Sequence, residues 1–243
     1  MQDVLGPECR RMSTDPRWPK LLSLAVHELR TPITVVSGYL RMVLKERAGP
    51  ISDQQRKLLE EAEKSCGRLS ALVGEMSDLS GLEGGTASFN SATLDLGGML
   101  AEAAAVLPEL PDREVPVVVE GTGDATLSGD ATRLRTALTA LLVALRREVV
   151  QSDRLIVRCA ASQDGGPPKT LIAIGEPDTI DAVLQADPTS LERFNEWRGG
   201  SGLSLAIARR VIERHGGMLY APPGGANAGA LVVFPRAGSF VEK

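Results

Sequence analysis

Two stretches of apolar residues, spaced alternately three and four positions apart, most constrain the fold of this chain. The first covers residues 22–43 and the second residues 59–76, with the segment AGPIS at residues 48–52 between them. This spacing is typical of helices that pack on other helices, and Ser52 is a suitable N-cap for the second helix. We therefore predict two long helices joined as an antiparallel hairpin. The apolar positions are Leu22, Val26, Leu29, Ile33, Val36, Leu40 and Val43, then Leu59, Ala62, Cys66, Leu69, Val73 and Met76.

A single hairpin has too little partner surface to bury both apolar stripes. A homodimer that forms a four-helix bundle would bury them. The alternative is a hairpin that packs on the rest of its own chain. We favour the dimer because a strict heptad stripe is narrower than the apolar face of most globular helices.

The sequence changes character after the Gly-rich segment GLEGGTASFN at residues 81–90, which predicts a domain boundary. Helices and strands then mix, as in an α/β sandwich with one sheet covered on one face by helices. The fold class is therefore α+β. The predicted parts are an N-terminal segment of unknown role (1–16), the hairpin (17–83), a linker (84–92) and the sandwich (93–243). Within it we predict helices at 96–107, 130–150 and 202–217, and strands at 115–121, 125–129, 154–161, 169–176, 218–223 and 230–236.

Composition excludes several classes of function. The net charge of -4 gives no reason to expect a nucleic-acid partner. Cys9, Cys66 and Cys159 have no metal-binding spacing, and such an odd number of cysteines suits a reducing compartment. The sequence contains no apolar run as long as a membrane span and no secretory signal. We therefore predict a cytoplasmic chain without a resident metal.

His27 is one of two histidines in the chain and lies one position after Val26 in the apolar stripe. It should therefore project from the bundle surface. A neutral imidazole leaves one ring nitrogen free to attack, and Glu28 is placed to hold the proton on the other nitrogen. Thr31 lies one turn further on the same face, with a hydroxyl that can position water. Pro32 removes a backbone donor and is expected to bend the helix just past the site.

The motif HELRTP at residues 27–32 resembles the phosphoacceptor motif of two-component sensor histidine kinases. In that family a dimeric two-helix hairpin precedes an ATP-binding α/β sandwich, and the order of parts here is similar over residues 17–236. The resemblance implies that His27 carries a phosphoryl group, that Glu28 assists its transfer, and that Thr31 positions water for dephosphorylating the partner. The implied partner is a response-regulator receiver domain, which we expect Arg30 and Pro32 to contact. The alternative is a surface histidine on an ordinary bundle helix.

The nucleotide-binding positions of the family are only partly preserved. Ala140 and Ala144 stand where the family has asparagines that hold Mg²⁺ and phosphates. Alanine offers no oxygen, whereas Mg²⁺ requires oxygen ligands. Arg147 falls where a phosphate-binding lysine often occurs and keeps its positive charge. These positions predict that the family's metal site is lost.

The next family motif, Asp-x-Gly-x-Gly, is replaced by Gly175, Pro177 and Thr179. Glu176 or Asp178 would substitute for its aspartate only after a shift of register, and Pro177 stiffens the loop. This adenine-binding motif is therefore predicted to be lost.

The final glycine motif is better preserved in RGGSGLSLAIARRVIERHGG at residues 198–217. Gly199, Gly200 and Gly202 precede a predicted helix N-terminus, which is a candidate phosphate cradle. Phe194 resembles the family's conserved phenylalanine, and we predict a short helical stretch at residues 180–189 in place of a long lid. We interpret His215 as a helix-end residue that interacts favourably with the helix dipole.

Three functions fit these features. The first is a histidine phosphotransferase that exchanges the phosphoryl group of His27 with a receiver domain and receives it from an upstream kinase, with weak or no use of ATP. The second is a divergent kinase that uses ATP and Mg²⁺ through Arg147, the glycines at 199–202 and unrecognised ligands. The third is a non-catalytic dimer that docks and regulates a response regulator or a kinase. We favour the first because the phosphoacceptor motif is complete while the nucleotide motifs are not.

Overall fold

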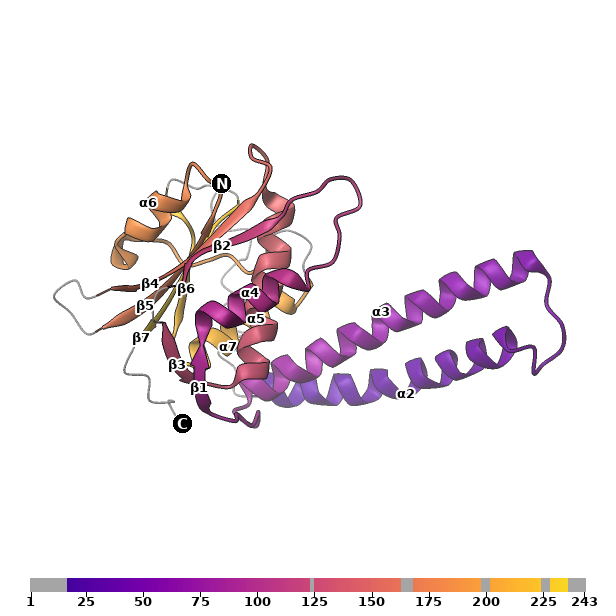
Figure 1. Cartoon of the computed structure of the whole chain (residues 1–243). Coiled ribbons are helices and arrows are strands. Elements are labelled where there is room, and N and C mark those ends of the chain that lie inside the picture. Colours follow the sequence, from indigo (N-terminus) through magenta and orange to yellow (C-terminus); the bar gives the residue numbers. More distant parts are fainter. Residues whose placement is uncertain (1–16, 123–124, 163–167, 198–201, 224–227, 236–243) are drawn as a thin grey trace. The chain divides into compact units, whose positions relative to one another are not determined.

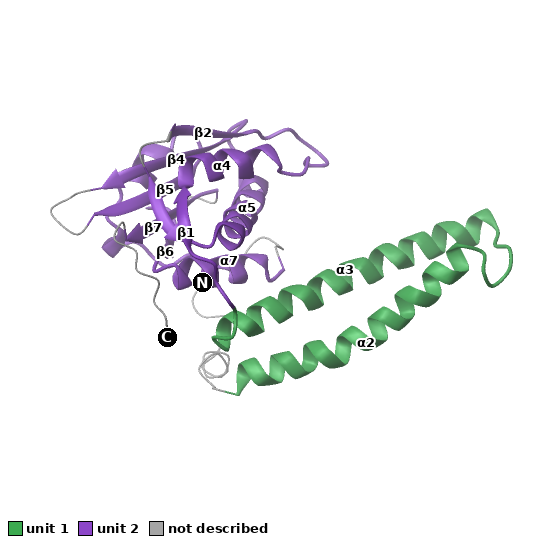
Figure 2. Cartoon of the chain, turned by 60° about the horizontal axis from the view of Figure 1, so that its bottom comes forward, with its two compact units in different colours: residues 1–87 green, residues 88–243 purple. Residues whose placement is uncertain are grey.

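Two long helices, α2 (Trp18–Leu44) and α3 (Asp53–Glu83), form the antiparallel hairpin that the heptad spacing predicted (Figure 1). The computed structural model describes residues 17–122, 125–162, 168–197, 202–223 and 228–235, so the predicted N-terminal segment 1–16 lies outside the described residues. The chain divides into two units after Ala87 (Figure 2). None of the described helices is both long and apolar enough to cross a lipid bilayer.

Polar contacts at the turn fix where the second helix of the hairpin begins. Ser52 Oγ accepts a hydrogen bond from Gln55 N at 3.3 Å, and Gln55 Oε1 accepts one from Ser52 N at 2.8 Å. This capping box satisfies two backbone donors at the start of α3. Arg56 Nη1 donates to the carbonyl oxygen of Leu44 at 3.1 Å, which ties α3 to the end of α2.

The apolar stripe is only partly buried within one hairpin. Leu22 and Val26 of α2 and Cys66 and Val73 of α3 are buried. In contrast, Leu29 is 43% exposed, and Val36 and Leu69 are also exposed although they belong to the same predicted stripe. A single chain therefore leaves apolar surface on both helices without a partner.

The second unit is built on a mixed five-stranded sheet with strand order β2-β4-β5-β7-β6. β2 pairs with β4 in parallel, and the other neighbours are antiparallel. A separate two-stranded sheet pairs the predicted strand β3 (Thr126–Gly129) with β1 (Ala92–Asp95), which the sequence analysis missed. The five strands are β2 (Val117–Thr122), β4 (Leu155–Ser162), β5 (Lys169–Gly175), β6 (Met218–Tyr220) and β7 (Ala230–Pro235).

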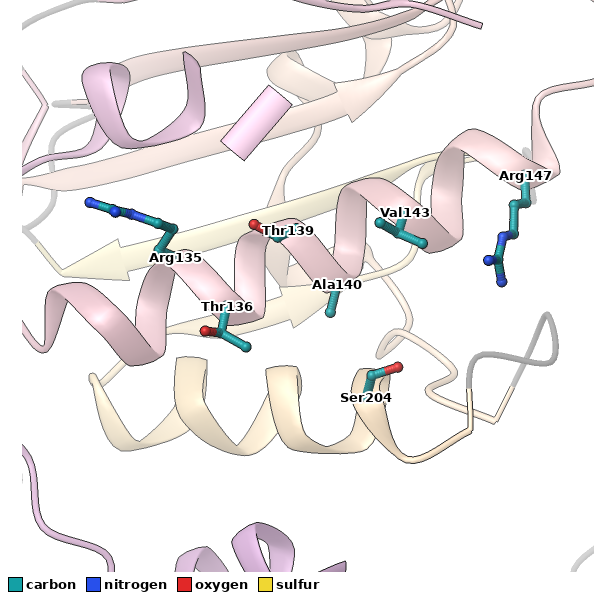
Figure 3. A pocket seen from close by; sticks show the side chains of 7 residues that line it. All are labelled: Arg135, Thr136, Thr139, Ala140, Val143, Arg147 and Ser204. Carbon is teal, nitrogen blue, oxygen red and sulfur yellow. The ribbon is translucent and has the colours of Figure 1, made fainter. Parts of the chain in front are cut away.

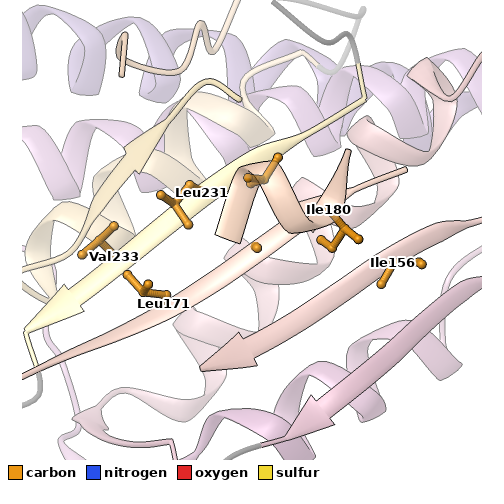
Figure 4. Close-up of a cluster of buried hydrophobic side chains, with 7 residues drawn as sticks. Ile156, Leu171, Ile180, Leu231 and Val233 are labelled. Atoms are coloured by element: carbon orange, nitrogen blue, oxygen red, sulfur yellow. The ribbon is translucent and has the colours of Figure 1, made fainter. Parts of the chain in front are cut away.

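Helices cover both faces of the sheet, whereas the sequence analysis predicted helices on one face only. α4 (Leu96–Ala105), α5 (Ala131–Glu148) and α7 (Ser204–Arg214) pack together on one face (Figure 1). The short helix α6 (Ile180–Gln185) packs on the other face. The reason lies in β5, whose residues are buried from Thr170 to Gly175 on both faces. Figure 4 shows the cluster beneath α6, which contains Ile156, Leu171, Ala173, Ile180, Val183, Leu231 and Val233.

Candidate functional site

His27 lies on the exposed surface of α2, with 78% of its side chain accessible to solvent. Its Nδ1 is 3.3 Å from Glu28 Oε1. Because an ionised carboxylate only accepts hydrogen bonds, this contact favours the tautomer with the proton on Nδ1. Nε2 then carries the lone pair, and it has no hydrogen-bond partner within the described part of the chain. The exposed ring thus offers solvent a nitrogen, Nε2, whose lone pair is not used by the described residues.

The other residues of the motif are also exposed. Thr31 is four positions after His27 and therefore lies on the same face of α2. Pro32 lies inside the continuous helix and has no N–H to donate to the carbonyl oxygen of Glu28. Two residues later, Thr34 Oγ1 donates to the carbonyl oxygen of Arg30 at 2.8 Å. The motif therefore presents the polar side chains of His27, Glu28, Arg30 and Thr31 to solvent, together with the apolar Leu29 and Pro32.

A pocket of about 480 Å³ lies between α5 and the N-terminus of α7. It contains two of the predicted nucleotide-site positions, Ala140 and Arg147, whereas Ala144 is buried in the core and does not line it. Figure 3 shows Ser204, at the start of α7, facing α5 near Ala140, with Arg147 farther toward the C-terminal end of α5. The described lining residues are Arg135, Thr136, Thr139, Ala140, Val143, Arg147 and Ser204.

The described lining fits an anion better than a divalent metal. Its oxygen-bearing side chains are the hydroxyls of Thr136, Thr139 and Ser204, and it contains no carboxylate or amide. Mg²⁺ in proteins is usually bound through carboxylates together with phosphate oxygens, so these residues do not fit Mg²⁺. Nor does any group of three acidic, histidine or cysteine residues in the described chain form a metal site. Arg147 and the N-terminus of α7 suit a phosphate.

Hydrogen bonds hold the turn that follows β5 in place. Glu176 Oε2 accepts hydrogen bonds from Ser152 Oγ at 2.8 Å and from Ser152 N at 3.0 Å. Thr179 Oγ1 accepts from Glu176 N at 3.1 Å. A Cβ atom added to Gly175 would lie 3.1 Å from Thr179 Oγ1, so a side chain here would crowd the turn. Glu176 Oε2 is therefore engaged in a structural contact with Ser152.

The other predicted nucleotide-site positions are placed as follows. Pro177 lies in the same turn, and Asp178 is exposed. Gly202 has a left-handed φ of 60°, which favours glycine, two residues before α7 begins. Phe194 is buried in the core. Gly199 and Gly200, the other two glycines of the predicted cradle, lie outside the described residues.

A buried hydrogen-bond network around His215 was missed by the sequence analysis. His215 Nδ1 donates to the carbonyl oxygen of Val211 at 2.7 Å, and Nε2 accepts from Asp130 N at 2.9 Å. Its ring meets Phe89 edge-on, with 5.4 Å between ring centroids. Burial lowers the pKa of His215, although the Val211 carbonyl and the Asp130 carboxylate oppose this shift. His215 does end α7, but as a neutral hydrogen-bonding residue and not as a charge on the helix dipole.

The Asp130 carboxylate extends this network to the start of the second unit. It accepts hydrogen bonds from Arg133 N and Asn90 N, each at 2.9 Å. Burial raises the pKa of Asp130, but these two hydrogen bonds and the charge of Arg133 outweigh burial and lower it overall. The network joins segments 85 positions apart in sequence at the Asp130–His215 contact, and no local pattern indicates such a contact.

Comparison with known proteins gives a consistent result. Residues 20–85 match the His Kinase A (phospho-acceptor) domain family. Sensor protein GacS of Pseudomonas syringae pv. syringae is 28% identical over 202 residues, which are 79% of this chain and 22% of GacS. Sensor protein VanS of Enterococcus faecium is 26% identical over 80% of this chain and 51% of VanS. The chain thus spans between about a fifth and a half of the length of these two relatives.

Two solved structures share the fold. Full-length ShkA in complex with AMPPNP has a TM-score of 0.62 and 23% identity, and the match covers 93% of this chain and 47% of ShkA. Histidine kinase AdeS of Acinetobacter baumannii has a TM-score of 0.52 and 17% identity, with 87% of this chain and 98% of AdeS covered. The helical hairpin followed by a sandwich is therefore a known arrangement.

Proposed function

We propose that this chain, which belongs to the two-component sensor histidine kinase family, is a phosphotransferase. It carries a phosphoryl group on His27 and exchanges it in the cytoplasm with the aspartate of a response-regulator receiver domain. An upstream kinase supplies the phosphoryl group, and the chain makes weak or no use of ATP itself. The observation that carries this proposal is the contrast between an exposed, oriented His27 and a pocket whose described lining does not fit Mg²⁺.

The geometry at His27 supports one defined step. The lone pair on Nε2 attacks the phosphorus of a phosphorylated aspartate, so that an N–P bond forms while the P–O bond to the carboxylate breaks. The aspartate leaves as a carboxylate. Glu28 stabilises the positive charge that develops on the ring through the proton on Nδ1. The reverse step returns the phosphoryl group to a receiver aspartate.

Thr31, Arg30 and Pro32 have supporting roles in this proposal. Thr31 lies on the face of α2 that carries His27, where its hydroxyl can orient the water that dephosphorylates the receiver. Arg30 and Pro32 contact the receiver beside the histidine. All three side chains are exposed, as this requires.

The pocket between α5 and α7 favours one alternative, a divergent kinase. Arg147 and Ser204 both line this space of about 480 Å³, which is large enough for a small-molecule ligand. Without a carboxylate or amide among the described lining residues to hold a metal, however, phosphoryl transfer from ATP loses its main source of charge stabilisation. Such losses cost orders of magnitude in rate.

Two phosphoryl donors distinguish the proposal from this alternative. We expect phosphoramidate, which transfers its phosphoryl group directly to imidazole, to label His27, and a panel of receiver domains to remove that label. We expect ATP with Mg²⁺ to give no labelling above background over the same time. Labelling from ATP at a comparable rate would support the kinase instead, and a label that no receiver removes would contradict the exchange.

We further propose that the hairpin pairs with a second copy of the chain through its exposed apolar residues. A four-helix bundle would cover them, and their number on both helices supports an extended interface. The exposed apolar residues are Leu21, Leu24, Leu29, Val35, Val36, Tyr39 and Met42 on α2, and Leu58, Leu69 and Leu72 on α3.

A charge placed in this stripe is expected to separate the two copies. Leu69→Glu should shift the chain from dimer to monomer in analytical ultracentrifugation, because it buries a carboxylate without a partner. Ala71→Glu adds the same charge to an exposed position about 200° further round the helix, and should leave the dimer intact. A wild-type chain that sediments as a monomer would refute the dimer.

A further inference from the structure

A second pocket lies beside a buried arginine, away from the positions discussed above. Arg146 occupies the last turn of α5 and is only 7% exposed. It lines a pocket of about 400 Å³ beneath the connection between α4 and β2. None of the described residues of this pocket also lines the pocket between α5 and α7.

The guanidinium of Arg146 is incompletely satisfied. Its Nη2 donates to the carbonyl oxygen of Pro108, but its Nε has no hydrogen-bond partner within the described chain. Nor does the Arg146 guanidinium form an ion pair with any described carboxylate. Burial, and then the charge of the neighbouring Arg147, lowers its pKa. A buried positive charge without a counter-ion is costly, so this position favours binding of an anion.

The rest of the lining restricts the kind of anion. Leu107, Leu110 and Val115 provide apolar surface. Glu109 and Glu114 line the same pocket and are both exposed. Their carboxylates disfavour a highly charged ligand more than a singly charged one. The apolar side chains favour an anion that carries a small hydrocarbon group.

Arg113 adds a second guanidinium to the pocket. It is held by two backbone carbonyls, because its Nη1 donates to Val149 O and its Nη2 donates to Arg147 O at 2.7 Å. Arginine suits carboxylates because its planar group offers paired donors.

We propose that this pocket binds a small monocarboxylic acid, with the carboxylate on the guanidinium of Arg146 and the hydrocarbon group against Leu107, Leu110 and Val115. The volume of about 400 Å³ lies within the range of small-molecule sites. This site goes beyond the proposed phosphotransfer function and does not depend on it.

Butyrate and its neutral analogue butyramide test the proposal on the whole wild-type chain. The Nε–H signal of Arg146 can be followed by ¹H–¹⁵N NMR, and through-bond correlation to its own backbone identifies it. We expect butyrate at millimolar concentration to shift this signal saturably, in line with the affinity of so small a ligand. Butyramide, or chloride at the same ionic strength, should leave it unchanged.

Two variants show whether the response comes from this pocket. Leu110→Trp, which fills the pocket and keeps Arg146, should weaken butyrate binding by about tenfold or more. Arg154→Lys changes an exposed arginine outside the pocket and should leave the affinity unchanged. The proposal would be overturned if butyrate caused no saturable shift, if Leu110→Trp bound it equally well, or if only inorganic phosphate shifted the signal.

Discussion

Replacing His27 with glutamine is expected to abolish phosphoryl labelling by phosphoramidate and leave the fold unchanged. Labelling is lost because glutamine has no nucleophilic nitrogen in place of Nε2. The fold is retained because 78% of the His27 side chain is exposed and its one described contact is with the equally exposed Glu28. We expect the free energy of unfolding to change by less than about 0.5 kcal/mol. Acid-labile label on the purified chain and urea unfolding measure the two effects.

Glu28→Gln is the matched control for this experiment. It keeps an oxygen that can accept from Nδ1–H but removes the charge that stabilises the ring during transfer. Labelling should therefore persist and slow by on the order of 100-fold. If His27→Gln retained the label, the phosphoacceptor would be another residue. If it unfolded the chain, the exposed position of His27 would be wrong.

The largest effect on stability is expected from the other histidine. His215→Ala should lower the free energy of unfolding of the second unit by about 3 kcal/mol. The substitution leaves the backbone N–H of Asp130 without its partner, removes one of the two hydrogen bonds that the carbonyl of Val211 accepts, and opens a cavity. Urea unfolding followed by the fluorescence of Trp197, in a Trp18→Phe background, reports on this unit.

The same histidine makes stability depend on pH in a defined direction. The pKa of His215 is lowered from 6.5 in the folded chain. As the pH falls, the unfolded chain therefore takes up a proton on this residue at a higher pH than the folded chain does. Its contribution to stability is therefore complete above pH 6.5 and is lost as the pH falls through the folded pKa. His215→Ala should flatten the profile of unfolding free energy against pH in this window. An unchanged profile in His215→Ala would contradict the lowered pKa.

The heptad spacing predicted the hairpin well because each helix must bury an apolar stripe whatever else it contacts. It could not show which stripe residues face the second helix of the same chain. Leu29, Val36 and Leu69 remain exposed there, while Leu22 and Cys66 are buried. The sequence of one chain does not separate packing within a hairpin from packing between copies.

The sandwich was less predictable where burial depends on distant segments. β1 has one buried residue, Leu94, and too short a pattern to predict a strand. α6 covers the second face of the sheet because β5 is apolar on both sides, which a short apolar run does not reveal. The burial of Arg146 in the last turn of α5 was likewise not foreseen from the sequence.

In the candidate site, too, only features with a local sequence pattern could be predicted. The motif at residues 27–32 could be found because its residues are contiguous, and the structure adds the contact between His27 and Glu28. The role of Glu176 could not be inferred, because it depends on hydrogen bonds to Ser152, 24 positions away. Residues in contact across the fold leave no local signal.

Calorimetric titration of the whole chain with ATP and Mg²⁺ tests the central claim most directly, since it measures nucleotide binding without requiring a partner. The account predicts no saturable heat up to millimolar ATP, which corresponds to binding weaker than about -4 kcal/mol. Saturable binding at micromolar ATP that is lost in Arg147→Met would contradict it, and would identify the pocket between α5 and α7 as a working nucleotide site.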